Sequence, residues 1–169
     1  MPTSNTPAVH PPERRLDEIA DEVLSLIQQQ AFAQALRELN ASVPHRYTAI
    51  FKVVGDRVRN VLLFDKRGEP LPPPLSDFPL ADSFCQFVLR DSFLHVDDSL
   101  QEPMLAGSPY HGVIRAYHAV ALTLLGAEVV GTLAHFDPEP QTLDPAHFGL
   151  LVLASRTLPE LLVASEAWQ

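Results

Sequence analysis

Apolar residues recur along this chain with two different spacings, which separate predicted helices from predicted strands. Residues 13–30 have helical spacing, with one apolar stripe formed by Leu16, Ile19, Ala20, Val23, Leu26 and Ile27. A second stripe follows the glutamine run 28–30 and contains Phe32, Ala35, Leu36 and Leu39. Residues 40–44 end this stripe, because the position before Pro44 disfavours helical backbone. The pattern fits two helices or one long bent helix.

A β-hairpin is predicted next. Residues 47–54 (YTAIFKVV) and 58–64 (VRNVLLF) are rich in β-branched and aromatic side chains, and Gly55 and Asp56 separate them. The following stretch holds five prolines between Pro70 and Pro79, which predicts a loop without regular structure. A loop of this length within a domain is either a functional lid or a stiff surface connector.

The second half of the chain predicts a short helix, three strands and a closing helix. The helix covers residues 82–90, a short strand covers 94–96, and a polar loop runs from 97 to 112. Residues 113–122 and 128–136 form two apolar strands that turn at Gly126. Asp144 and Pro145 have the residue types of a helix N-cap and first helical position.

This order of elements predicts an α+β fold. Strands joined by tight turns form a central antiparallel sheet, with the terminal helices on one face. The middle helix and the two long loops would cover the other face, and a ligand pocket would lie between them and the sheet. Residues 1–12 contain four prolines and no apolar periodicity, so they are predicted to be a disordered leader.

The chain resembles a GAF domain in this order of elements and in the sequences of residues 112–122 (GVIRAYHAVAL) and 131–137 (GTLAHFD). The resemblance covers residues 31–164 and implies a GAF/PAS-like domain over 31–169, preceded by the helix 13–30. GAF domains bind cyclic nucleotides, tetrapyrroles, haem or small anions on one scaffold, so the resemblance implies a sensor but leaves its ligand and cofactor unknown. It also implies a homodimer through the terminal helices, although packing within one chain explains their apolar stripes equally well.

Composition narrows the function classes. The formal net charge is −9 and the 12 basic residues are scattered, which argues against nucleic acid or an anionic membrane as a partner. No apolar run has the length of a membrane span, and the N-terminus lacks the features of a secretion signal. The single cysteine excludes an internal disulfide. A cytoplasmic protein is therefore predicted.

The sequence contains no phosphate-binding glycine loop, no G-x-S-x-G and no H-E-x-x-H, so no catalytic residue is predicted. Cys85 with a histidine would allow a thiol-dependent enzyme, but its apolar surroundings predict a buried thiol. One GAF group reduces free methionine sulfoxide with several cysteines, which this chain lacks.

The seven histidines predict no metal site, because none pair at helical i, i+4 spacing. His118 and His135 lie on strands that should pair; they are expected to satisfy core hydrogen bonds rather than bind haem. Residues 108–111 are similar to the histidine region of phytochrome-type GAF domains. The bilin-anchoring cysteine is missing there, which argues against a covalent bilin.

The remaining candidates form a polar and aromatic set suited to a small ligand. The predicted ligand-binding residues are Phe51, Ser83, Cys85, Phe93, Tyr110, His111, Arg115, Tyr117 and His118. Strand alternation places Arg115 and Tyr117 on one face of the sheet and His118 on the other, so these three cannot all line one pocket in a regular strand. If Arg115 is buried, it needs an anionic partner, either a ligand or Asp97 or Asp98.

The sequence thus favours a non-catalytic signalling module that binds a small molecule and transmits the signal through a dimer or a partner protein. Two alternatives stay open. One is a thiol-dependent enzyme that uses Cys85, and the other is a protein-interaction module whose pocket is filled by its own side chains.

Overall fold

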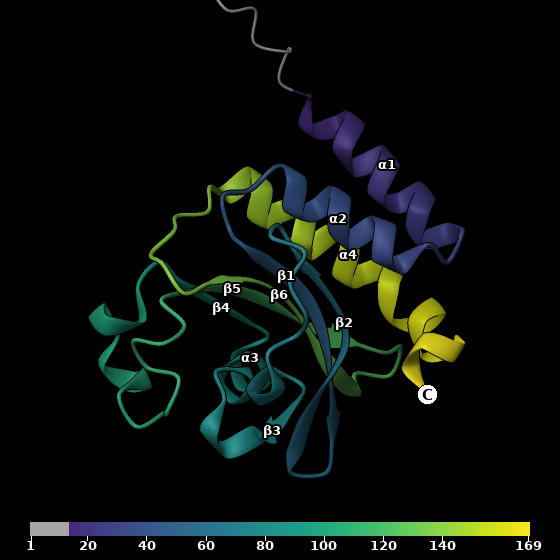
Figure 1. Cartoon of the computed structure of the whole chain (residues 1–169). Helices are drawn as coiled ribbons and strands as arrows, with labels where there is room; N and C mark the ends of the chain where they lie inside the picture. The colour runs from purple at the N-terminus through teal and green to yellow at the C-terminus, as the bar shows by residue number, and fades with distance from the viewer. Residues whose placement is uncertain (1–13) are drawn as a thin grey trace, which may run out of the picture.

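An antiparallel sheet of six strands lies at the centre of the molecule, in the order β3-β2-β1-β6-β5-β4 (Figure 1). This computed structural model describes residues 14–169, so the predicted leader over 1–12 lies outside the described residues. The strands are β1 Tyr47–Val54, β2 Arg57–Asp65, β3 Asp77–Pro79, β4 Phe93–Val96, β5 Ala116–Thr123 and β6 Val129–Asp137. Helices and sheet together confirm the predicted α+β class.

Three helices cover one face of the sheet: α1 Leu16–Gln28, α2 Phe32–Ala41 and α4 Pro145–Val163 (Figure 1). The first two are separate helices because Gln30 adopts a left-handed φ of 58°. In that conformation the amide of Ala31 donates to the carbonyl oxygen of Leu26 at 2.8 Å, a bond that ends α1. The chain then reverses, and α2 packs beside α1.

The core on this face joins the three helices to the sheet. The apolar stripe of α1 is buried within the chain, together with strand residues such as Ile50, Val120 and Leu133. By length and composition, α4 is the one described helix that could cross a membrane. However, Leu151 and Leu162 of α4 are fully buried in this core, as expected for the central helix of a folded domain.

On the opposite face, α3 (Cys85–Asp91) and the long loops lie against the sheet (Figure 1). The prediction that the proline-rich stretch has no regular structure is wrong in part. It contains the 3₁₀ turn Pro73–Leu75 and the short strand β3, which pairs with β2 from Arg57 to Arg59. Because β3 is an edge strand, Pro79 at its end costs the sheet no internal hydrogen bond.

Two details of β5 and β6 shape the sheet. β5 begins at Ala116 rather than at the predicted Val113, because Val113 and Ile114 form a turn on the carbonyl oxygen of Tyr110. In β6, a Cβ atom on Gly131 would lie 2.1 Å from the carbonyl oxygen of Phe51 in β1. Only glycine therefore allows this close approach of the two backbones.

Candidate functional site

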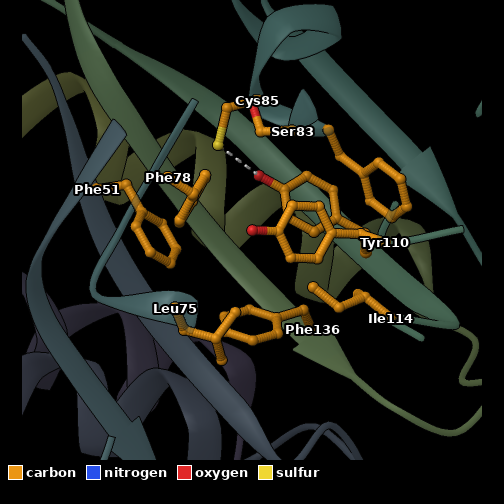
Figure 2. A pocket seen from close by; sticks show the side chains of 10 residues that line it. Phe51, Leu75, Phe78, Ser83, Cys85, Tyr110, Ile114 and Phe136 are labelled. Atoms are coloured by element: carbon orange, nitrogen blue, oxygen red, sulfur yellow. Dashed lines mark hydrogen bonds between the residues drawn. The ribbon is translucent and has the colours of Figure 1, made fainter. Parts of the chain in front are cut away.

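A small cavity lies between the sheet and the loops that cover it, at the position where a GAF-like pocket is predicted (Figure 2). Its volume is about 20 Å³. Ten residues line it: Phe51, Leu75, Phe78, Ser83, Phe84, Cys85, Tyr110, Ile114, Tyr117 and Phe136. Six of these ten side chains are aromatic, and none is charged.

The cavity is filled mainly by these side chains. A cavity of roughly 10–15 Å³ holds one water molecule, whereas ligand pockets are typically about 300–1,000 Å³. The cavity therefore has room for about one water molecule and not for a metabolite. A larger ligand can enter only if some of the lining side chains move.

Three side chains lie over the cavity: Leu75 in the 3₁₀ turn, Phe78 in the edge strand β3 and Tyr110 in the loop before β5. These three residues are called the cover below. The rings of Phe78 and Phe51 meet edge to face at 5.6 Å, and those of Phe78 and Tyr110 at 5.7 Å. On the β2 side the cover is held by the three-residue pairing of β3 with β2 and by two flanking hydrogen bonds, from Asn60 N to the carbonyl oxygen of Ser76 at 2.9 Å and from Leu80 N to that of Asp56 at 2.8 Å. Tyr110 Oη adds a long 3.4 Å hydrogen bond to the carbonyl oxygen of Pro74.

The polar edge of the cavity is formed by Cys85 and Tyr117. The Sγ atom of Cys85 lies 3.3 Å from Tyr117 Oη, the contact drawn as a dashed line from Cys85 in Figure 2. The same sulfur atom lies 3.6 Å from Thr132 Oγ1. Burial raises the pKa of the Cys85 thiol, and burial also raises the pKa of Tyr117 well above its ordinary value. Cys85 is therefore a neutral, inaccessible thiol at neutral pH, which is the opposite of a catalytic nucleophile.

The structure brings five of the predicted ligand-binding residues together around the cavity: Phe51, Ser83, Cys85, Tyr110 and Tyr117. Four others do not line it. The half-buried His111 lies in the turn above β5, and the exposed Phe93 packs edge to face against Phe148 on the helix side. Arg115 donates two hydrogen bonds to Asp98, at 2.6 and 2.7 Å, so its anionic partner is internal.

His118 lies on the helix side of the sheet, as strand alternation requires. It belongs to a cluster with His45 and His135, and all three histidines are buried. His118 Nδ1 lies 2.9 Å from His45 Nε2, and its Nε2 lies 2.9 Å from Asp97 Oδ1. Because a carboxylate only accepts hydrogen bonds, His118 donates through Nε2 and accepts at Nδ1 from His45.

This assignment leaves a lone pair on His45 Nδ1, which has no hydrogen-bond partner among the described residues. A second chain of bonds runs from Asn40 Nδ2 to Thr48 Oγ1 at 2.9 Å, and from Thr48 Oγ1 to His135 Nδ1 at 2.6 Å. Lys66 Nζ fastens the turn that carries His45, lying 2.8–2.9 Å from the carbonyl oxygens of Asn40, Val43 and His45.

Burial keeps the histidine cluster neutral. Burial is the main cause that lowers the pKa of His45 to about 3, and the neighbouring His118 lowers it further. Burial also lowers the pKa of His118 to about 4 against the opposing hydrogen bond to Asp97, and it lowers the pKa of His135 well below 6.5. The cluster thus satisfies core hydrogen bonds, as predicted for His118 and His135.

Sequence reasoning missed half of the cavity lining: Leu75, Phe78, Phe84, Ile114 and Phe136. Phe136 could have been found, because it is the pairing partner of Tyr117 and must point to the same face. Leu75 and Phe78 carried no such signal, since the proline-rich loop has no periodicity to assign a face. His45 was missed because it stands in a turn.

Comparisons with known proteins place the chain among GAF-type structures. No family model matches it, and no curated protein matches it. It is similar to free methionine-R-sulfoxide reductase from Neisseria meningitidis, with a TM-score of 0.71 and 15% identity over 95% of this chain and 96% of that one.

Two further structures are GAF domains. One is from an Acinetobacter phosphoenolpyruvate-protein phosphotransferase, with a TM-score of 0.71 and 12% identity over 93% of this chain and 98% of that one. The other is a phycoerythrobilin-bound domain from a cyanobacterial phytochrome, with a TM-score of 0.67 and 11% identity over 89% and 95%. At these identities the similarity concerns the fold.

Proposed function

We propose that this chain, which has the GAF fold, is a non-catalytic signalling module that takes a small uncharged molecule between the sheet and the cover. The proposal rests on the composition of this cavity: a floor of aromatic side chains from the sheet, a cover from the 3₁₀ turn, the short edge strand β3 and the loop before β5, and no charged lining residue. The phycoerythrobilin-bound domain shows that the same fold accommodates a ligand in another protein.

Movement of the cover has a calculable cost. Phe78 is 7% exposed, and exposing a buried phenylalanine side chain costs about 1.5–3 kcal/mol. A ligand that needs the open state therefore binds about 10- to 150-fold more weakly than it would bind a pocket that is already open. Removing the Phe78 ring should recover that factor, because the cavity would then be open in advance.

The chemistry of the lining defines the class of ligand. Aromatic walls favour a flat, largely apolar molecule, and Tyr117 Oη, Cys85 Sγ and the Ser83 hydroxyl offer hydrogen bonds at one edge. A charged ligand would leave its charge unpaired in this lining, at a high desolvation cost. Indole, which is flat and carries one N–H, is a suitable probe.

The proposal is tested by titrating indole into the wild-type chain and into the variants Phe78→Ala and Phe93→Ala, with the melting temperature as readout. Phe93 is a matched control, since it is an exposed phenylalanine outside the cavity. We expect indole to stabilise Phe78→Ala strongly, the wild type weakly, and Phe93→Ala as weakly as the wild type. Equal or absent shifts in all three proteins would reject the cavity as a ligand site.

A protein-interaction module with a filled cavity is the second candidate, and the small cavity volume favours it. It predicts that the wild type binds no member of a broad metabolite panel. The similarity to the methionine sulfoxide reductase does not support thiol chemistry in this chain. Cys85, the single cysteine of this chain, is buried, and burial raises the pKa of its thiol.

We further propose that the module works in the cytoplasm and passes its signal on through a homodimer or a partner protein. The terminal helices α1 and α4 lie together on the outer side of the sheet, which supports them as an output surface (Figure 1). Among residues 14–169, none of the exposed large apolar side chains lies on these two helices. The dimer therefore stays a prediction, to be measured by light scattering of the purified chain.

A further inference from the structure

Three potential metal ligands meet at the edge of the sheet, on the side away from the cavity. The antiparallel register of β4 and β5 places His95 directly opposite His118. Asp97 follows two residues after His95, so both point to the same face. Asp97 Oδ1 lies 2.9 Å from His118 Nε2 and 3.4 Å from His95 Nε2, and all three ligand atoms lie within 4.8 Å of one another.

These separations are close to those of a coordination shell. Tetrahedral zinc with bonds of about 2.0–2.1 Å to nitrogen and oxygen holds its ligand atoms roughly 3.3 Å apart. Two of the separations in the cluster, 2.9 and 3.4 Å, differ from that value by less than about 0.5 Å. The third separation, between the ligand nitrogens of His95 and His118, is no more than 4.8 Å.

We propose that His95, Asp97 and His118 form a binding site for a divalent transition-metal ion such as Zn²⁺. Two imidazole nitrogens and one carboxylate oxygen suit zinc, cobalt or nickel better than magnesium or calcium, which prefer oxygen ligands alone. The side chains of His95 and Asp97 are 42% and 52% exposed. A metal ion can therefore enter from solvent, and water can occupy its remaining coordination position.

Neighbouring side chains already hold the ligands in place. His118 Nδ1 lies 2.9 Å from His45 Nε2, which fixes the ring of a fully buried ligand in the way outer partners orient metal-bound histidines. The His95 ring lies between His118, at 4.3 Å and 79°, and Phe148, at 5.7 Å. Only Asp97 lacks such packing, and it is the ligand nearest to solvent.

Metal binding also has a defined proton rearrangement. Zinc would bind at Nε2 of His118, so the proton of this ring would have to sit on Nδ1 instead. The Nδ1–H group of His118 would then donate a hydrogen bond to His45 Nε2. The proton that His45 Nε2 carried would then be held on His45 Nδ1. That atom has a free lone pair in the structure, so both imidazoles remain neutral and no net proton is released.

The site is tested on the full chain after treatment with a chelator, by isothermal titration with Zn²⁺ and by visible absorption with Co²⁺. The variants are His95→Ala and Asp97→Asn, both at exposed positions. His147→Ala is the matched control, because His147 also contacts a carboxylate, Asp144 Oδ2 at 2.7 Å, but lies outside the cluster. The test does not depend on the cavity or its ligand.

We expect the wild type and His147→Ala to bind one ion per chain and to give the same Co²⁺ spectrum. His95→Ala and Asp97→Asn should each bind the metal ion at least ~10-fold more weakly. A loss of ~10-fold is the lower end of what results when a residue that only supports a metal ligand is mutated, and a ligand itself should matter at least as much. The proposal is overturned if the wild type shows no saturable binding, if the two cluster variants bind like the wild type, or if His147→Ala loses as much affinity as they do.

Discussion

The buried histidine cluster predicts a loss of stability in mild acid. The ordinary histidine pKa is 6.5, whereas the pKa is about 3 for His45 and about 4 for His118 in the folded chain, and well below 6.5 for His135. When the pH falls below 6.5, the unfolded chain gains three protons that the folded chain cannot accept. The stability is therefore complete above pH 6.5 and declines as the pH falls toward the folded pKa values.

The size of this effect follows from the ordinary pKa alone, because at about pH 5.5 the folded histidines are still neutral. Between about pH 7.5 and about pH 5.5, each histidine then lowers the unfolding free energy by about 1.4 kcal/mol, and all three together lower it by about 4 kcal/mol. The carboxylates Asp65, Asp98 and Asp144 do not contribute in this range, since the pKa of each is lowered below 3.8 by hydrogen bonds to its neighbours.

The assay is urea denaturation in the presence of a chelator, at both pH values. His135→Asn keeps a polar atom near the position of Nδ1, beside Thr48 Oγ1, but removes one titrating group. We expect its loss between the two pH values to be about 3 kcal/mol instead of about 4 kcal/mol. An unfolding free energy that is unchanged between the two pH values would refute the buried, neutral state of the cluster.

Three further predictions concern stability and reactivity. Gly131→Ala should destabilise the fold by at least about 2 kcal/mol, because the added Cβ atom would meet the carbonyl oxygen of Phe51. Gly149→Ala, on the open side of α4, should stabilise the fold by about 0.5–1 kcal/mol. Urea denaturation of both variants checks this prediction. Thr48→Val should lower the unfolding free energy by about 1–3 kcal/mol, because Asn40 and His135 each lose a buried hydrogen-bond partner. Thr48→Ser keeps the hydroxyl and should keep most of the stability. Equal losses in the two variants would exclude the hydroxyl as the cause. Cys85 should not react with a thiol reagent in the native chain and should react fully in denaturant, and fast native labelling would show that the thiol is accessible.

The sequence allowed the layers of the fold to be predicted because each layer has its own periodicity. The alternation in residues 113–122 was enough to place Tyr117 and His118 on opposite faces, and the pairing of β5 with β6 then determines the direction of Phe136. The GAF-like order of strands and helices followed from the same pattern and from the turns between strands.

The cavity and the metal cluster could not be predicted in the same way. The volume of the cavity depends on how Leu75 and Phe78 fold back from a loop without periodicity, which is a matter of packing. The pair His95 and His118 depends on the register between β4 and β5, which a long irregular loop separates in the sequence. The absence of an i, i+4 histidine pair predicted no metal site, but that criterion applies to helices and misses ligands that meet across strands.

The central claim is that the cavity under the cover is a binding site for a small uncharged molecule. Native mass spectrometry of the wild type, of Phe78→Ala and of the control Phe93→Ala, each incubated with the same metabolite panel, tests it most directly. The proposal predicts a one-to-one complex with at least one uncharged, flat compound, more abundant for Phe78→Ala than for the wild type and unchanged in Phe93→Ala. If neither the wild type nor Phe78→Ala retains any compound, the claim is contradicted, and the filled interaction module is the better account.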